Sequence, residues 1–68
     1  MNMISVNSSN LSKVGYSNGT LYIEFNSGSL YSYSNVPEYV YNGLLSASSK
    51  GKYFHAYIKS SYKFTRLS

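Results

Sequence analysis

The 68-residue sequence lacks cysteine and aspartate, and it has only one histidine and two acidic residues. Without thiols there is neither a disulfide framework nor a thiolate metal site. The acids are Glu24 and Glu38, and we expect the first to pair with Lys13 across a hairpin and the second to start a helix. A carboxylate pair, a Ser-His-Asp triad or a metal cluster needs more partners than these. We therefore expect a non-catalytic protein with no metal and no cofactor. The remaining enzyme alternative is a Ser-Lys or Tyr-Lys arrangement such as Ser49 with Lys59.

Long hydrophobic runs are also absent. No segment is long enough to span a bilayer, and residues 1–10 lack the cationic region and apolar run of a secretory signal. We expect a cytoplasmic protein without a membrane partner. Because a chain of this length lies near the lower limit for one self-sufficient core, we expect a single domain over residues 1–68. Nine tyrosines and three phenylalanines offer large side chains for that core, and association into a homo-oligomer is the alternative source of stability.

The best local signal is a β-hairpin around Asn18-Gly19. This pair is preferred in two-residue type I′ turns, because both positions need a positive φ. The turn fixes a register in which the apolar pairs share one face and Lys13 lies opposite Glu24 on the other. In this register Gly15 faces Tyr22, and we expect the glycine to leave room for the ring.

A second turn is expected at residues 26–28, where Asn-Ser-Gly suits a three-residue loop with a bulge at Gly28. This loop places Tyr31 and Tyr33 on the core face. A two-residue loop is the alternative, and it would move both rings to the outer face beside Tyr22. We favour the core position, and residues 3–6 are expected to add an edge strand.

Residues 35–47 have the apolar spacing of a helix. Asn35 is the expected N-cap, with Pro37 in the first turn and Glu38 three residues after the cap. The expected buried stripe consists of Val40, Tyr41, Leu44, Leu45 and Ala47. Gly43 lowers the helix propensity by ~1 kcal/mol relative to alanine, so we expect it to permit close packing.

A second helix is expected to follow Ser48 or Ser49, either of which can cap it. Its apolar side chains recur on one face, at Phe54, Tyr57 and Ile58. Its polar side chains recur on another, at Lys52, His55 and Lys59. The chain then ends in an extended tail or a further strand. Together these elements predict an α+β fold, a three- to four-stranded antiparallel β-meander with two short C-terminal helices packed on one face.

The charges are distributed unevenly along the chain. The net charge is +4, yet residues 1–49 contain one base and two acids. Residues 50–68 contain no acid and five bases, which are Lys50, Lys52, Lys59, Lys63 and Arg66. A one-sided basic segment favours a polyanionic partner, most often nucleic acid. A solvated basic end without a partner is the alternative interpretation.

The candidate nucleic-acid contacts are Lys50, Lys52, Tyr53, His55, Lys59, Tyr62, Lys63 and Arg66. We expect the cations to contact phosphates and Tyr53 or Tyr62 to stack on a base, because ring stacking contributes ~1–3 kcal/mol per base. Five phosphate contacts predict a salt slope of about −3.5 for a single strand. Residues 48–51, at a helix start, are either a site for one phosphate or an ordinary cap.

Several short motifs occur together in this sequence. They are Ser8-Ser9, Gly15-Tyr16, Leu21 with Phe25, Gly28, Tyr31-x-Tyr33, Val36-Pro37, Ser49-x-Gly51, Phe54, Ile58-Lys59 and Tyr62. On these motifs the chain resembles the KTSC domain family from Val6 to Tyr62. That family is named for the C-terminal extension of some lysyl-tRNA synthetases, and it also occurs alone in short bacterial and phage proteins. The resemblance implies a bacterial or phage-encoded protein and suggests RNA as a partner. It marks as signature residues Tyr31, Tyr33, Ser49, Gly51 and Lys59.

The hypothesis from the sequence is therefore a small binding domain for RNA or single-stranded nucleic acid, which uses the surface of residues 50–66. The alternative is a protein-interaction module, such as a phage-encoded inhibitor that docks on an acidic host protein. For that module an open edge strand and an outer sheet face with Tyr22 and Leu30 are the expected surface.

Overall fold

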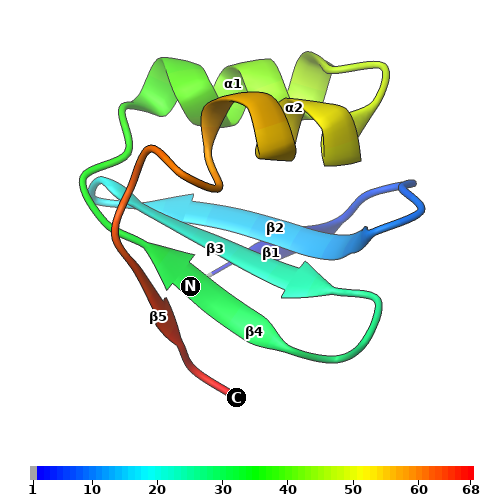
Figure 1. The fold of residues 1–68 in the computed structure, drawn as a ribbon, viewed down its shortest axis with the longest axis horizontal. Helices are drawn as coiled ribbons and strands as arrows, with labels where there is room; N and C mark the ends of the chain where they lie inside the picture. Colours follow the sequence, from blue (N-terminus) through cyan, green and yellow to red (C-terminus); the bar gives the residue numbers. More distant parts are fainter. Residues whose placement is uncertain (1) are drawn as a thin grey trace.

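Five antiparallel strands form one sheet, and two helices lie over one of its faces (Figure 1). The computed structural model describes residues 2–68. The strands are β1 (Met3–Ser5), β2 (Leu11–Ser17), β3 (Thr20–Phe25), β4 (Leu30–Tyr33) and β5 (Phe64–Arg66), and the helices are α1 (Glu38–Ser46) and α2 (Lys50–Tyr57). Neighbours in the sheet follow the chain order from β1 to β5. The predicted α+β meander with two helices on one face is confirmed, and the segment after the helices adds a fifth strand.

The hairpin between β2 and β3 has the predicted turn and register. Asn18 and Gly19 have φ angles of 50° and 81°, the positive values that a type I′ turn requires. Lys13 lies opposite Glu24, and the apolar pairs fall on the other face of the sheet. Turn chemistry alone was sufficient to fix this register.

The expected role of Gly15 is wrong. A Cβ atom at this position would lie 2.7 Å from the Sδ atom of Met3 and 2.7 Å from the carbonyl oxygen of Asn2. The glycine therefore makes room for the edge strand β1, which pairs with β2, and not for the ring of Tyr22.

The turn between β3 and β4 is the predicted three-residue loop. Gly28 has a φ of 95°, and its N–H donates to the carbonyl of Phe25 at 2.8 Å. The N–H of Phe25 donates to the carbonyl of Ser29 at 2.9 Å, which closes the loop. In the resulting register Tyr31 and Tyr33 share the helix-facing side, where Tyr33 is 4% exposed and Tyr31 is half-buried.

The predicted start of the first helix is wrong. α1 begins at Glu38, after Pro37 at the N-cap position. Asn35 instead has a φ of 57°, a left-handed conformation that asparagine tolerates better than most residues. This turn directs Val36 into the core, where it is 1% exposed and its N–H donates to the carbonyl of Gly19 at 2.8 Å. A residue before proline also avoids helical dihedrals, so the helix starts only after Val36.

The second helix is capped as predicted, by Ser49, whose hydroxyl accepts a first-turn N–H at 3.4 Å. Phe54 and Ile58 are buried, but the prediction for Tyr57 is wrong, because its side chain is 59% exposed. The ring of Tyr57 packs on Tyr53 of the same helix, with centroids 4.8 Å apart, instead of on the sheet.

Gly43 allows α1 and α2 to pack closely, as predicted. A Cβ atom at Gly43 would meet the hydroxyl of Tyr53 and would lie 2.8 Å from the Cζ atom of that ring. This contact packs α1 against α2 through the ring of Tyr53.

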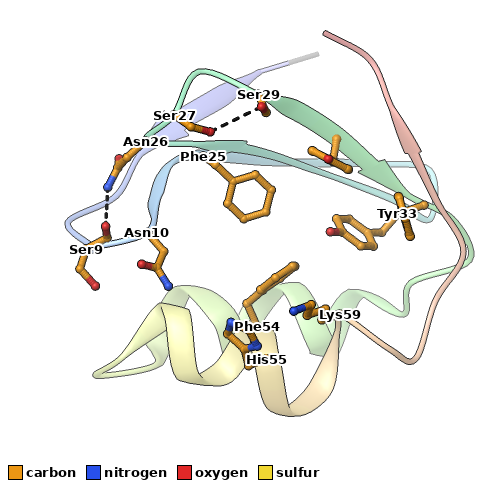
Figure 2. Close-up of a pocket in the computed structure, with 12 residues that line it drawn as sticks. Ser9, Asn10, Phe25, Asn26, Ser27, Ser29, Tyr33, Phe54, His55 and Lys59 are labelled. Carbon is orange, nitrogen blue, oxygen red and sulfur yellow. Dashed lines mark hydrogen bonds between the residues drawn. The ribbon is translucent and has the colours of Figure 1, made fainter.

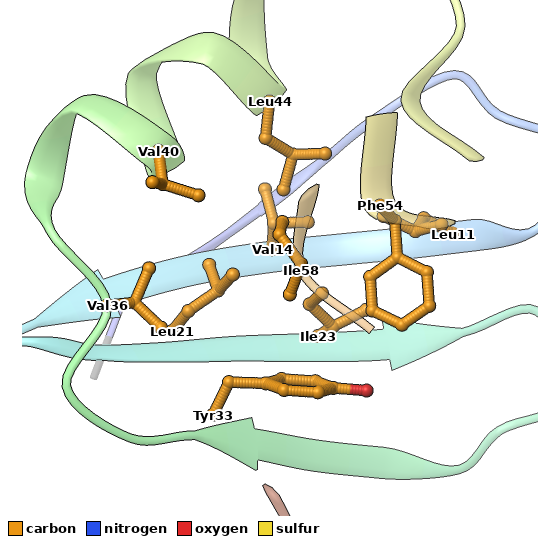
Figure 3. Close-up of a cluster of buried hydrophobic side chains, with 10 residues drawn as sticks. All are labelled: Leu11, Val14, Leu21, Ile23, Tyr33, Val36, Val40, Leu44, Phe54 and Ile58. Atoms are coloured by element: carbon orange, nitrogen blue, oxygen red, sulfur yellow. The ribbon is translucent and has the colours of Figure 1, made fainter. Parts of the chain in front are cut away.

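The core lies between the helices and the middle of the sheet (Figure 3). It consists of Leu11, Val14, Leu21, Ile23, Tyr33, Val36, Val40, Leu44, Phe54 and Ile58. Burial of the helix-facing side chains falls across the sheet. Ile23 in β3 is 0% exposed, Tyr31 in β4 is half-buried, and Phe64 in β5 is 59% exposed. The inner face of β4 and β5 is therefore incompletely covered by the helices.

Candidate nucleic-acid interface

A hollow of about 600 Å³ opens on this incompletely covered face, between α2 and the sheet (Figure 2). Five rings line it, from Phe25, Tyr31, Tyr33, Phe54 and Phe64. We name this hollow the aromatic pocket. The polar part of its wall consists of Ser9, Asn10, Asn26, Ser27, Ser29, His55 and Lys59. Phe25 and Phe54 connect the sheet to the helix edge to face, with centroids 5.4 Å apart and planes at 72°. The result is a concave apolar surface with a polar rim.

The register of the strands brings the rings of the sheet together. β4 and β5 pair Tyr33 with Phe64 and Tyr31 with Arg66. Residues directly opposite in antiparallel strands share a face, so Phe64 lies beside both tyrosines, with centroids 5.6 Å from Tyr31 and 6.0 Å from Tyr33. Phe64 is the most exposed of the five rings, and it is the ring that the pocket offers most freely to a ligand.

The hydroxyl of Tyr33 points into the aromatic pocket (Figure 2). Burial, with a smaller contribution from Tyr31, raises the pKa of Tyr33 from 10.0 to about 12. None of the side-chain hydrogen bonds within residues 2–68 involves this hydroxyl. The Tyr33 hydroxyl is therefore a donor and acceptor directed at the contents of the pocket.

The rim of the aromatic pocket carries positive charge. His55 and Lys59 line its α2 side, and both are exposed. On the sheet side, the Nη2 atom of Arg66 donates to the hydroxyl of Ser29 at 3.3 Å, at the mouth of the pocket. No acidic side chain of the described residues lines the pocket. The rim is thus suited to an anion.

Two further hollows adjoin the aromatic pocket and extend this charge. One shares His55 with the pocket and adds Lys52, and the other shares Lys59 and adds Lys63. Because the hollows have residues in common, their basic side chains follow one another along α2 and the loop to β5. We name Lys52, His55, Lys59 and Lys63 the basic row. No described acidic residue lines any of the three hollows.

The structure thus brings together part of the set of contacts predicted from the sequence. The basic row holds four of these residues, and Tyr62 lines the same hollow as Lys63. Lys50 lies apart, because its Nζ atom donates to the carbonyl of Ala47 at 3.0 Å, at the end of α1. Tyr53 packs between the helices, and Arg66 stands at the mouth of the aromatic pocket.

The signature residues line adjoining hollows. Tyr31, Tyr33 and Lys59 line the aromatic pocket, and Ser49 and Gly51 line the hollow that contains Lys52. The sequence reasoning did not assign Phe25 and Phe64 to the site. The alternation of Phe64 and Arg66 in the tail is a signal for a strand. It does not show which strand pairs with the tail, because β4 is distant in the sequence.

Within residues 2–68, no three His, Cys, Asp or Glu side chains gather into a group that could hold a metal ion. No helix among the same residues combines the length and the apolar character needed to cross a membrane.

Fold and site together define a small α+β domain with an aromatic pocket beside a row of bases. A protein-family model described as the KTSC domain matches residues 7–62. The crystal structure of a KTSC domain protein from Yersinia pestis is similar over 98% of this chain and 97% of that chain, with a TM-score of 0.95 and 32% sequence identity. The chain belongs to the KTSC domain family.

Two kinds of relative differ in how much of their length this chain covers. The lysine–tRNA ligase of a Nostoc species is 51% identical over 49 residues, which span 72% of this chain and 9% of the ligase. An uncharacterised protein of Stutzerimonas stutzeri is 37% identical over 70 residues, which span 98% of this chain and 99% of that protein. The chain therefore corresponds to a small segment of the ligase and to almost the whole of the second relative.

Proposed function

We propose that this domain binds single-stranded nucleic acid, and RNA in particular, without catalysing a reaction on it. The observation that carries the proposal is the basic row, four consecutive bases along adjoining hollows that no described acidic residue lines. In this proposal the three lysines contact successive phosphates, and His55 donates a hydrogen bond to one of them. Non-specific single-strand binders combine such a groove with rings on which bases stack, and the aromatic pocket lies beside the row.

Family relatives support RNA as the partner. A segment half identical to this chain is part of a protein named as a lysine–tRNA ligase, which acts on an RNA. The matched segment covers 9% of that ligase, so the support concerns the type of partner and not the ligation reaction. Because RNA is the proposed partner and the relatives described above come from bacteria, we extend the proposal to the cytoplasm of a bacterial cell.

The salt dependence of binding tests the proposal. Fluorescence anisotropy of a labelled oligoribonucleotide, titrated with the protein between about 50 and 200 mM salt, gives the slope of the binding constant. Three phosphate contacts by Lys52, Lys59 and Lys63 predict a slope of about −2. The slope is smaller than that expected for five contacts, because Lys50 and Arg66 lie outside the basic row.

A matched pair of lysine variants locates the contact. Lys59→Gln is expected to reduce the slope by about 0.7, whereas Lys13→Gln leaves it unchanged, because Lys13 is also exposed but lies on the outer face of the sheet. Absence of binding at the lowest salt concentration, or a slope near zero, refutes the proposal.

An acidic protein is the competing partner for the same cations. The outer sheet face expected for it contains Tyr22 and Leu30, but both side chains are half-buried, so this face offers no large apolar patch through these residues. Capture from lysate before and after nuclease treatment separates the partners. A stoichiometric partner that survives nuclease, together with no affinity for oligoribonucleotides, would replace the proposal.

A further inference from the structure

Part of the apolar surface of the aromatic pocket is not buried by the core of the protein. Phe64 contacts Tyr31 and Tyr33 and yet remains 59% exposed, at the edge of a hollow of about 600 Å³. Ligand sites have this size and this mostly aromatic lining with a few polar groups. The hollow is therefore large enough for one planar ring system with a substituent.

The polar groups of the pocket define which ring system fits. The hydroxyl of Tyr33, which is in none of the hydrogen bonds within residues 2–68, points inward and can both donate and accept a hydrogen bond. At the rim, Nδ2 of Asn26 donates to the carbonyl of Ser9 at 2.8 Å, which holds that side chain and leaves its amide oxygen as an acceptor. A ring with donors and acceptors along its edge satisfies these groups, whereas a plain hydrocarbon leaves them unpaired.

The charge around the aromatic pocket distinguishes between two classes of ligand, a cationic group and a planar ring with an anionic group. Aromatic cages also bind quaternary ammonium groups through cation–π interactions. Here Lys59 lines the pocket, Arg66 stands at its mouth, and no described acidic residue is part of its lining. A cation would be repelled, and a planar ring that carries an anionic group is favoured.

We infer that the aromatic pocket binds one nucleobase, unstacked from its neighbours, with the phosphate of the same nucleotide at Lys59 and His55. The base packs against Phe64, and the hydroxyl of Tyr33 reads its edge. For a nucleotide within a strand, the inference rests on the proposed function. A free nucleotide offers the pocket the same base and phosphate, and its binding does not depend on the proposed function.

An abasic strand separates base binding from phosphate binding. The probe is a strand of about eight tetrahydrofuran residues and their phosphates, which has the charge of an oligoribonucleotide of equal length but no bases. Wild-type protein is expected to bind the abasic strand about 5- to 150-fold more weakly, the affinity that corresponds to one base stacked on a ring.

Substitutions in the pocket give the second readout. Phe64→Ala is expected to lose about the same factor for the natural strand and nothing for the abasic strand, and Phe64→Tyr retains the affinity because it keeps a ring. Tyr57→Ala is the matched control, since Tyr57 has the same exposure of 59% and lies outside the three hollows. Tyr33→Phe is expected to lose about 2- to 12-fold and to change the ranking of the four homopolymers.

The outcomes distinguish this inference from the proposed function. Equal affinity for natural and abasic strands, with Phe64→Ala unchanged, refutes the base pocket and leaves phosphate binding intact. Saturable binding of a nucleoside monophosphate that Phe64→Ala abolishes, without binding of any strand, supports the pocket and removes the proposed function. If neither strand nor nucleotide binds to folded protein, as judged by circular dichroism, both are wrong.

Discussion

The contact between Gly43 and Tyr53 predicts that one substitution changes stability in opposite directions in two backgrounds. Gly43→Ala removes the helix penalty of glycine, which favours folding by ~1 kcal/mol. In the wild type, however, the new Cβ atom would lie 2.8 Å from Cζ of Tyr53, and carbon atoms in good contact are ~3.5 Å apart or more. The ring must therefore move by at least ~0.7 Å. Overpacking of this kind costs ~1–3 kcal/mol, so we expect a net loss of ~0–2 kcal/mol.

In a Tyr53→Ala background the obstacle is gone, and Gly43→Ala is expected to stabilise the protein by ~1 kcal/mol. Urea unfolding followed by far-ultraviolet circular dichroism, with linear extrapolation, gives all four free energies of the double-mutant cycle. Asn42→Ala, at an exposed position of the same helix, is the control and should gain the same small increment in both backgrounds. Equal stabilisation by Gly43→Ala with and without the Tyr53 ring would refute the packing of α1 on α2 described above.

Two further predictions concern the core. The pKa of Tyr33 rises from 10.0 to about 12 on folding, so the folded state holds this proton more tightly. Stability is expected to fall as pH rises from about 10 to 12, by at most ~2–3 kcal/mol, because the hydroxyl faces an open hollow where solvent screens its charge. Unfolding midpoints of the wild type and Tyr33→Phe across this interval measure the difference, and parallel curves would contradict the assignment. Leu44→Ala removes a side chain of α1 that is 0% exposed and should lower the free energy of unfolding, measured in urea, by ~2.7–5.0 kcal/mol. A loss below ~1 kcal/mol would mean that α1 does not pack on the sheet as described.

The parts of the fold that could be predicted from the sequence depend on local chemistry. Asn18-Gly19 and Gly28 demand positive φ, and each loop length then fixes which side chains face the core. The start of α1 could not be predicted in this way. Asn35 looked like a cap, but its conformation is set by the burial of Val36 and the hydrogen bond of that residue to the first hairpin.

The candidate site was predictable to the same extent. The uneven distribution of charge identified the lysines of the basic row, because a run of bases without acids is visible in one dimension. The aromatic pocket was not visible, since it needs β5 to pair with β4 and place Phe64 against Tyr31 and Tyr33. That pairing joins segments on either side of both helices, and no pattern within either segment encodes it.

The carbonyl of Gly19 accepts the N–H of Val36, so the tip of the first hairpin also anchors the segment that leads into α1. One type I′ turn thus connects the sheet to the segment that leads into the helical layer. A substitution that disrupts this tip would affect more than the hairpin itself, because the segment before α1 would lose its hydrogen bond to the sheet. Sequence drift at this tip should therefore be restrained in related chains even though the glycine side of the turn has open space around it.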